Sequence, residues 1–534
     1  MNEQKFFIRG TIVLAAANII AKILGAIFKI PLTYILKEEG MAIFNTASCV
    51  YSMFLTFVIS GIPLATSRLV SADTALKKDA DAIKTVTAAK RLLAILGVIS
   101  SALLFLLAEP LAVAMKDPLA SYAIKVISPS VFFVAIGAAY KSYFQGTGRM
   151  IPTAISQVTE AFVRLVIGYL FAVWFIRYGI SLTAAGATFG VTAGEIIATI
   201  ILALLYFFKK IKIKEKSQLK YKKIYPMILS VAIPMLICSI TLSSVNMMDA
   251  ATVRNQLLKI NFTPESAEQF LLRYSSYTTL FDDLLTKLKL SSEGARWLYG
   301  AYSGYALTVF HLPMGIIATL SVSILPLIAG NLAKNNLRAV RSSCNIATNL
   351  TLFCAVPASV LFFTSSDIIL RLLFQNTASA HMLTLVSPCL IFLSLSQLFT
   401  SILHSAGKVY EPFIIQLIGM GIKILGNIIL VKIPYLNIDG AIISSIIAFL
   451  FIAITEAILL FRLFGVKYRF REIISPIIAA IPMYIILKLT FEPLNFIFSN
   501  AFLAFLISVF TSGLSYLLAF SVVSPKGLSG FIKK

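Results

Sequence analysis

Long apolar segments recur along the whole chain of 534 residues and leave few alternatives to a membrane fold. A helix needs about 20 apolar residues to cross a bilayer, and we count about fourteen such segments. They cover approximately residues 10–35, 43–70, 90–113, 122–144, 153–176, 183–208, 226–249, 299–329, 343–364, 383–405, 412–433, 438–463, 473–490 and 497–522. Hydrophobic residues make up 58% of the chain and charged residues only 13%, far from the balance of a soluble globular protein. The sequence therefore predicts an all-α polytopic membrane protein.

Basic residues gather in every second loop between these segments. The largest group has eight lysines between Lys209 and Lys223, whereas the short loops of the opposite side hold isolated basic residues. By the positive-inside rule, the lysine-rich loops and both termini are expected in the cytoplasm. Most of the net charge of +23 is then explained by the basic loops that set the orientation of the chain in the membrane. We therefore expect no nucleic-acid partner.

An internal repeat relates the two halves of the chain at a constant offset of about 259 residues. The matching positions are Ser128-Pro129 with Ser387-Pro388, Gly148-Arg149 with Gly407-Lys408, Gln157 with Gln416, and Arg164 with Lys423. Each copy holds an even number of helices, so both copies have the same orientation. We expect a six-helix lobe at 1–208, a basic cytoplasmic linker at 209–225 and a second six-helix lobe at 226–465 with an outer loop at 250–298. The segment 466–534 adds two helices and a cytoplasmic tail.

Two lysines interrupt the first apolar segment. Asn18, Lys22, Gly25 and Lys29 are spaced so that they share one face of a helix. An ammonium at the bilayer centre costs roughly 2.5–3.5 kcal/mol on insertion scales, so this face is expected to line protein or a wet cavity. We interpret Lys22 as part of a cationic pathway. Lys29 lies nearer the outer end and either joins that pathway or extends its ammonium to the interface.

Three further basic residues lie within or at the ends of the expected helices and complete the candidate binding set. Arg68 is either a topological anchor or a gate contact. Arg164 and Lys423 are equivalent in the repeat, and we expect both to face the cavity. Glu160 lies one turn before Arg164, so the sequence leaves open whether Arg164 contacts substrate or pairs with Glu160.

Other polar residues in the apolar segments carry less information. Glu195 and Glu456 do not align in the repeat, and we interpret them as packing or helix-end residues. The three histidines are scattered without acid or cysteine partners at ligand spacing, so we expect no metal site and no cofactor. No catalytic motif emerges, and we expect a protein that is not an enzyme.

Several loose motifs together resemble a known superfamily. They are Phe144-Gln-Gly-Thr-Gly-Arg-Met-Ile-Pro152 followed by Gln157, Gly61-Ile-Pro-Leu-Ala-Thr-Ser-Arg-Leu-Val70, and Leu312-Pro-Met-Gly-Ile through Ile324-Leu-Pro326. The chain resembles the multidrug/oligosaccharidyl-lipid/polysaccharide exporter superfamily. Within it, the chain is similar to the stage V sporulation protein B and polysaccharide-export branch, which is itself similar to the lipid II flippase MurJ.

The resemblance implies a V-shaped transporter of about fourteen helices in the bacterial cytoplasmic membrane. It implies a flippase that moves an undecaprenyl-pyrophosphate-linked sugar from the inner to the outer leaflet by alternating access. Lys22 matches a first-helix arginine of that flippase, and Lys29 falls near a second. Thr308 stands where the flippase has an arginine before its Pro-x-Gly motif, so the cargo can differ from lipid II.

The alternative is a cation-coupled multidrug antiporter of the same superfamily. The expected partners are the lipid-linked pyrophosphate oligosaccharide and membrane lipids, with a coupling ion left open, and we expect a monomer. The sequence does not select between the vegetative wall, the spore cortex and an exopolysaccharide as the pathway served.

Overall fold

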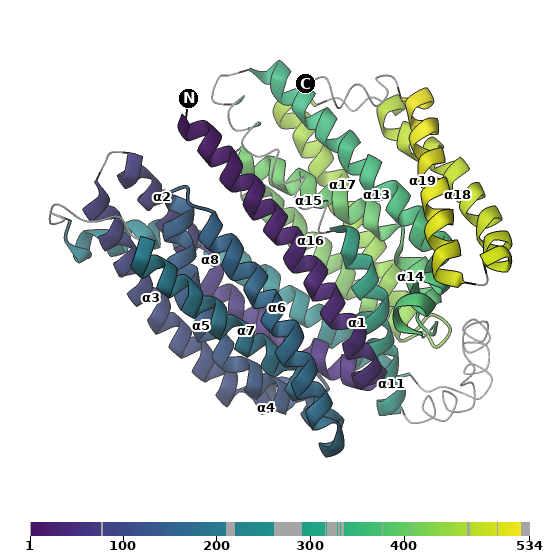
Figure 1. Ribbon diagram of the computed structural model, residues 1–534, viewed down its shortest axis with the longest axis horizontal. Helices are drawn as coiled ribbons and strands as arrows, with labels where there is room; N and C mark the ends of the chain where they lie inside the picture. The colour runs from purple at the N-terminus through teal and green to yellow at the C-terminus, as the bar shows by residue number, and fades with distance from the viewer. Residues whose placement is uncertain are drawn as a thin grey trace. The chain divides into compact units, whose positions relative to one another are not determined.

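The computed structural model describes residues 2–75, 78–209, 219–260, 291–314, 317, 328, 332, 336–375, 377–406, 408, 410–466, 470–498 and 500–524. Nearly all of these residues are helical, and none of them lies in a strand. The chain divides into two compact units, Met1–Asn255 and Gln256–Lys534. Each unit is a bundle of long helices (Figure 1).

The first unit is built mainly from long helices, with short turns between them. Its elements are α1 (Asn2–Ile59), α2 (Ile62–Ala75), α3 (Asp79–Leu106), α4 (Ala108–Ala114), η1 (Pro118–Ala120), α5 (Ser121–Gly146), α6 (Ile151–Phe175), η2 (Ile176–Tyr178), α7 (Ile180–Lys209) and α8 (Tyr221–Leu257). The most extensive packing joins α6 to α7, and α5 packs against both α3 and α7.

Two breaks shape the start of the first unit. The long helix α1 is kinked at Lys37, whose φ of 51° is not helical, so α1 covers two of the spans expected from the sequence. The chain breaks again after Ile59, where Gly61 has φ +86°. A Cβ atom at Gly61 would lie 2.9 Å from Ala232 Cα of α8, so only glycine fits this turn.

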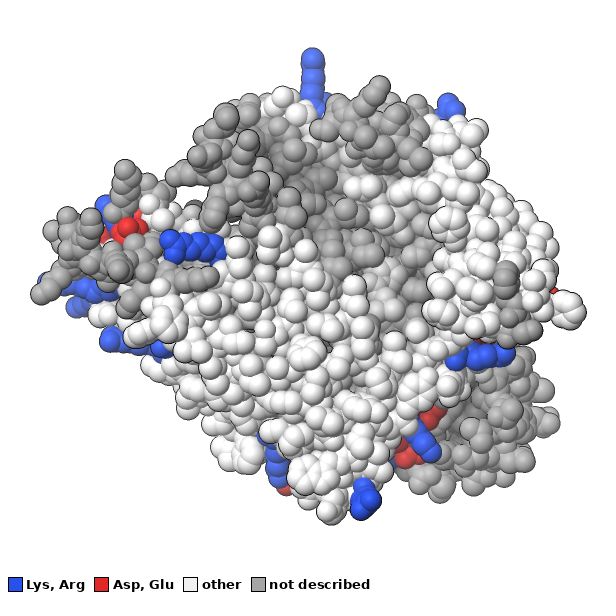
Figure 2. All heavy atoms as spheres, viewed as in Figure 1, with Lys and Arg blue, Asp and Glu red and all other residues white. Residues whose placement is uncertain are grey.

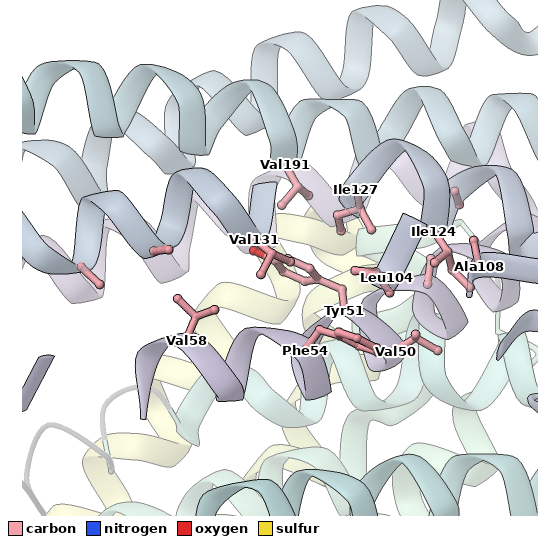
Figure 3. Packing of buried hydrophobic residues seen from close by; sticks show 14 of the residues in the cluster. Val50, Tyr51, Phe54, Val58, Leu104, Ala108, Ile124, Ile127, Val131 and Val191 are labelled. Atoms are coloured by element: carbon pink, nitrogen blue, oxygen red, sulfur yellow. The ribbon is translucent and has the colours of Figure 1, made fainter. Parts of the chain in front are cut away.

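The core of the first unit is formed by aliphatic and aromatic side chains from helices α1 to α8. Figure 3 shows part of it, with the Tyr51 and Phe54 rings of α1 among side chains of α3, α4, α5 and α7. Leu104, Ile124 and Ile127 are buried there almost completely. This packing fixes the second half of α1 against the bundle.

The second unit is also a bundle of helices, and it ends in two further long helices. Its elements are α11 (Ser291–Gly300), η3 (Ala301–Ala306), α13 (Leu337–Phe374), α14 (Ala380–Val386), α15 (Cys389–Ser405), α16 (Tyr410–Gly426), η4 (Asn427–Val431), α17 (Ile438–Phe464), α18 (Phe470–Phe498) and α19 (Ala501–Val523). Helices α18 and α19 lie side by side against α13 (Figure 1). The Tyr516 hydroxyl of α19 donates a hydrogen bond to Phe353 O of α13 at 3.0 Å.

Among the described residues, ten helices are long and apolar enough to cross a membrane. The number becomes eleven if α14 and α15, which are bent by 45° at their junction, form one span. The polytopic all-helical class is therefore confirmed, while the count of fourteen stays a prediction. Across the face drawn in Figure 2, most described side chains are uncharged, and the lysines and arginines form a few separate groups.

The lobe boundaries predicted from the repeat also stay a prediction. In the structure α8 belongs to the first unit, although the repeat assigns it to the second lobe. Most of the basic linker (210–218), of the outer loop (261–290) and of the C-terminal tail (525–534) lies outside the described residues.

Candidate functional site

Glycines bring helices α6 and α7 close together and so determine which side chains meet. A Cβ atom at Gly190 of α7 would lie 2.8 Å from Arg164 O of α6, and one at Gly194 would lie 2.8 Å from Glu160 O. Real Cβ atoms do not approach carbonyl oxygens this closely, so the two backbones could not pack in this way with alanine. Glu195 follows Gly194 directly and therefore lies beside Glu160.

An ion pair lies on the face of α6 that the sequence singled out. Arg164 Nη2 donates a hydrogen bond to Glu160 Oε1, and the two side chains are 30% and 16% exposed. The sequence left open whether Arg164 is neutralised by Glu160, and the structure shows the pair formed. Arg164 Nε and Gln157 Oε1 are buried and have no hydrogen-bond partner among the described residues, so the face has unused donor and acceptor capacity.

Two more charged side chains converge on this pair. Lys29 of α1 is half-buried and lies within electrostatic range of Arg164. Glu195 is 8% exposed, lies within hydrogen-bonding reach of Glu160, and interacts electrostatically with Arg164 and with Lys141 of α5. We call Lys29, Glu160, Arg164 and Glu195 the charged cluster. It combines two cations and two carboxyl groups inside apolar helices.

The remaining predicted site residues are on α1, α2 and α16. Lys22 is exposed on α1, about two turns before Lys29. Arg68 belongs to α2, but its side chain lies outside the described residues. Lys423 is on α16 of the second unit, within electrostatic range of Cys389. The expectation that Arg164 and Lys423 face one cavity stays a prediction.

Sequence reasoning missed the position of Glu195. It lies in the middle of α7 and not at a helix end, and it contacts charged side chains rather than apolar packing alone. The available signal was the glycine directly before it, together with the repeated small residues Gly186, Gly190 and Gly194, which favour a close helix partner.

A second buried ion pair was not predicted either. Arg254 Nη1 of α8 donates to Asp117 Oδ2 at 2.7 Å and to Thr46 Oγ1 of α1 at 2.5 Å. The Arg254 and Asp117 side chains are 3% and 0% exposed. Sequence separations of 137 and 208 residues gave no local signal for this contact. It ties the end of α8 to α1.

Lys125 illustrates a basic residue at a helix end with a structural role. Its ammonium donates to Glu109 Oε1 at 2.6 Å on the surface of the first unit. This hydrogen bond and the positive charge lower the pKa of the Glu109 carboxyl. The ion pair with Glu109 therefore accounts for the position of Lys125, and no contact with substrate needs to be assumed.

Comparison with known proteins assigns the chain to a family. The sequence model of the family described as polysaccharide biosynthesis protein matches residues 7–332, more than half of the chain. The chain belongs to the polysaccharide biosynthesis protein family. A second model, described as lipid II flippase MurJ, matches residues 284–505 of this polysaccharide biosynthesis protein family member. The superfamily and branch predicted from the motifs are confirmed.

Curated relatives of this polysaccharide biosynthesis protein family member match over most of their length. Stage V sporulation protein B of Bacillus subtilis (strain 168) is 24% identical over 478 residues, which is 88% of this chain and 86% of the relative. The lipid II flippase MurJ of the same strain is 23% identical over 526 residues, which is 92% of this chain and 90% of the relative.

Solved structures confirm the fold of this polysaccharide biosynthesis protein family member. A lipid II flippase MurJ in an inward closed conformation matches with a TM-score of 0.66 at 18% identity, covering 96% of this chain and 98% of that chain. A multidrug resistance MATE family transporter in an inward-facing conformation matches with a TM-score of 0.64 at 13% identity, covering 84% and 97%. The chain is thus a multi-pass membrane protein of a transporter fold.

Proposed function

We propose that this protein is a flippase that moves an undecaprenyl-pyrophosphate-linked sugar from the inner to the outer leaflet of the bacterial cytoplasmic membrane. The cargo is a lipid II-like peptidoglycan precursor or a polysaccharide repeat unit. Membership of the polysaccharide biosynthesis protein family and similarity to a lipid II flippase and to stage V sporulation protein B support this function. The structural observation that carries it is the meeting of Lys29 and Arg164 inside apolar helices.

Cations at this depth suit a pyrophosphate head group. Two unit charges about 4 Å apart attract by about 1 kcal/mol in water but by about 4 kcal/mol at an effective dielectric constant of about 20. Lys29 and Arg164 together therefore offset a large part of the cost of moving a multiply charged head group through the bilayer. Guanidinium nitrogens also bind phosphate oxygens in a bidentate manner, which favours Arg164 as the directional contact.

Glu160 acts in this proposal as an internal substitute for the cargo. It occupies Arg164 when no pyrophosphate is bound and keeps the buried guanidinium charge compensated. An arriving pyrophosphate displaces Glu160 from Arg164 and uses the vacant Nε donor. The released carboxyl then lies beside Glu195, within hydrogen-bonding reach.

The proposed transport motion and topology are based on the internal repeat and on the lysine-rich loops. Two six-helix lobes rock against each other, the lipid tail stays in the bilayer, and Lys22, Arg68 and Lys423 contribute further positive charge along the path. Both termini lie in the cytoplasm, and the protein acts as a monomer without catalysing a reaction. The internal repeat and the lysine-rich loops support this arrangement.

A cation-coupled multidrug antiporter is the second candidate. The observation that favours it is the proximity of Glu160 and Glu195 inside the first unit, because neighbouring carboxyl groups also suit a cationic ligand. The two candidates differ in the sign of the cargo charge, which makes them separable by a binding experiment.

The deciding experiment is a titration of the purified protein in native mass spectrometry. The ligands are lipid II, an undecaprenyl-pyrophosphate oligosaccharide and a neutral lipid, and the variants are Lys22→Ala, Lys29→Ala and Arg164→Ala. The flippase is supported if the protein retains the pyrophosphate lipids selectively and Arg164→Ala abolishes that retention. Equal retention of all three lipids, unchanged in every variant, contradicts the flippase and favours the antiporter.

A further inference from the structure

A buried carboxyl group in the second unit has no charged partner among the residues that the structure describes. Glu456 lies well inside α17, the most apolar of the described candidate spans with a mean hydropathy of 2.5, and its side chain is 0% exposed. The Thr400 hydroxyl of α15 donates to Glu456 Oε1 at 2.7 Å. Gln416 Nε2 of α16 donates in turn to Thr400 Oγ1 at 2.8 Å. Glu456 Oε2 is buried and has no hydrogen-bond partner among the described residues.

Charged and titratable groups on the elements packed against α17 do not compensate Glu456. Arg341 of α13 donates to Phe464 O at 2.6 Å, and His381 of α14 bonds to Asp439. The others on α13, α15, α16 and α17 are Arg338, Cys344, Cys354, Asp367, Arg371, Cys389, His404, Tyr410, Glu411, Lys423 and Arg462. Within the described part of the chain, none of these groups forms an ion pair with Glu456.

The repeat explains why this carboxyl group lacks a cation. The offset that relates Arg164 to Lys423 also relates Lys141 to Thr400 and Gln157 to Gln416. In the first unit, Lys141 of α5 interacts electrostatically with the buried Glu195 of α7. In the second unit, Thr400 of α15 bonds to the buried Glu456 of α17. Both units therefore carry a buried glutamate on the corresponding helix, although Glu456 lies two residues beyond the repeat equivalent of Glu195, and Thr400 stands where the first unit has Lys141.

An ionised carboxylate cannot remain at such a position at low cost. The effective penalty for burying an unpaired ion in a protein is several kcal/mol, and buried carboxyl groups in this situation become neutral. One hydroxyl donor compensates only a small part of that penalty. A neutral carboxyl fits the geometry, because its carbonyl oxygen accepts from Thr400 while the other oxygen carries hydrogen.

We propose that Glu456, Thr400 and Gln416 form a proton-binding site within the second unit. The ligand is a proton held on Glu456, and Thr400, held by Gln416, orients the carboxyl group. Binding of this proton does not depend on which lipid the protein carries. Release requires separation of α15 from α17, because the site is closed to solvent in this conformation.

Infrared difference spectroscopy of the full-length protein in lipid nanodiscs tests the site. At neutral pH, the wild type should show a carbonyl stretching band of a protonated carboxyl group, and Glu456→Gln should lose one carboxyl equivalent of it. Thr400→Val should move that band to higher frequency, because a hydrogen bond to the carbonyl oxygen is lost. Thr400→Ser should restore the band position. Ser401→Ala, on the exposed side of α15, is the matched control and should change nothing.

Two outcomes overturn the proposal. If the wild type and Glu456→Gln give the same carbonyl band, Glu456 is ionised at neutral pH. If addition of sodium chloride at constant pH removes the band, the site prefers a metal cation to a proton. Thermal unfolding of each variant confirms that it is folded, and lipid retention measured in parallel tests the flippase separately.

Discussion

At the scale of single residues, Arg164 is the most informative position in the chain. It pairs with Glu160, lies within electrostatic range of Lys29, and keeps one buried nitrogen without a partner among the described residues. A purely structural arginine would be expected to use all its donors when it is buried. The unpaired Nε donor leaves a hydrogen-bonding position that an anionic ligand of the proposed kind can use.

Removal of the competing carboxylate should strengthen cargo binding. We predict that Glu160→Gln raises the affinity for an undecaprenyl-pyrophosphate lipid about tenfold, because a charge-assisted hydrogen bond is worth roughly 1.5–3 kcal/mol. Titration by native mass spectrometry measures the change. Glu411→Gln, which removes an exposed carboxylate paired with Lys408, is the control and should leave affinity unchanged. An unchanged or lower affinity of Glu160→Gln would contradict the competition.

Lys29 should contribute to the same binding. We predict that Lys29→Ala lowers pyrophosphate-lipid affinity by about tenfold, because one cation is lost from a site of reduced dielectric. Lys488→Ala removes an exposed lysine from the apolar helix α18 and serves as the control in the same titration. Equal effects of the two substitutions would show that Lys29 acts only through net charge.

At the scale of elements, the packing of α6 on α7 positions the charged cluster. We predict that Gly194→Ala destabilises the protein by about 1–3 kcal/mol, because the new methyl group meets Glu160 O. Gly513→Ala is the matched control on α19, where a Cβ atom would have no neighbour within 4 Å, and it should be neutral or slightly stabilising. Thermal unfolding in detergent measures both. A Gly194→Ala protein as stable as the wild type would mean that the two helices separate easily.

The connection between α8 and α1 should also be sensitive to substitution. We predict that Arg254→Ala destabilises the protein by about 3–5 kcal/mol, because it leaves the fully buried Asp117 without its partner. The double substitution Arg254→Ala with Asp117→Ala should recover part of this loss. If the single and double variants unfold at the same temperature, the ion pair contributes little.

The sequence predicted the helical class, the charged face of α6 and the family, because each depends on local composition and periodicity. It did not predict that α1 runs as one kinked helix through Lys37, since a single residue with positive φ has no compositional signal. It also did not place Glu195 or Arg254, because their partners are distant in sequence. Contacts of this kind depend on helix packing, which hydrophobic periodicity alone does not determine.

At the scale of the whole molecule, topology is the property that the sequence predicts most directly. We predict that both termini lie in the cytoplasm, because the fourteen predicted spans place the lysine-rich loops on the same side as the termini. A reporter that fluoresces only in the cytoplasm, fused after Lys534, should be bright, and a reporter that is active only outside should be inactive there. The reverse result would invert the proposed direction of every span.

The ion pair between Glu160 and Arg164 has a consequence for the choice of cargo among the lipids that surround the protein. Anionic phospholipids of the bilayer carry about one negative charge each, as Glu160 does, so exchange with the carboxylate offers them no electrostatic advantage. A pyrophosphate carries more charge and, under the proposed function, displaces Glu160 from Arg164 more readily. In the proposed mechanism, this exchange discriminates against abundant phospholipids and in favour of a pyrophosphate-linked lipid.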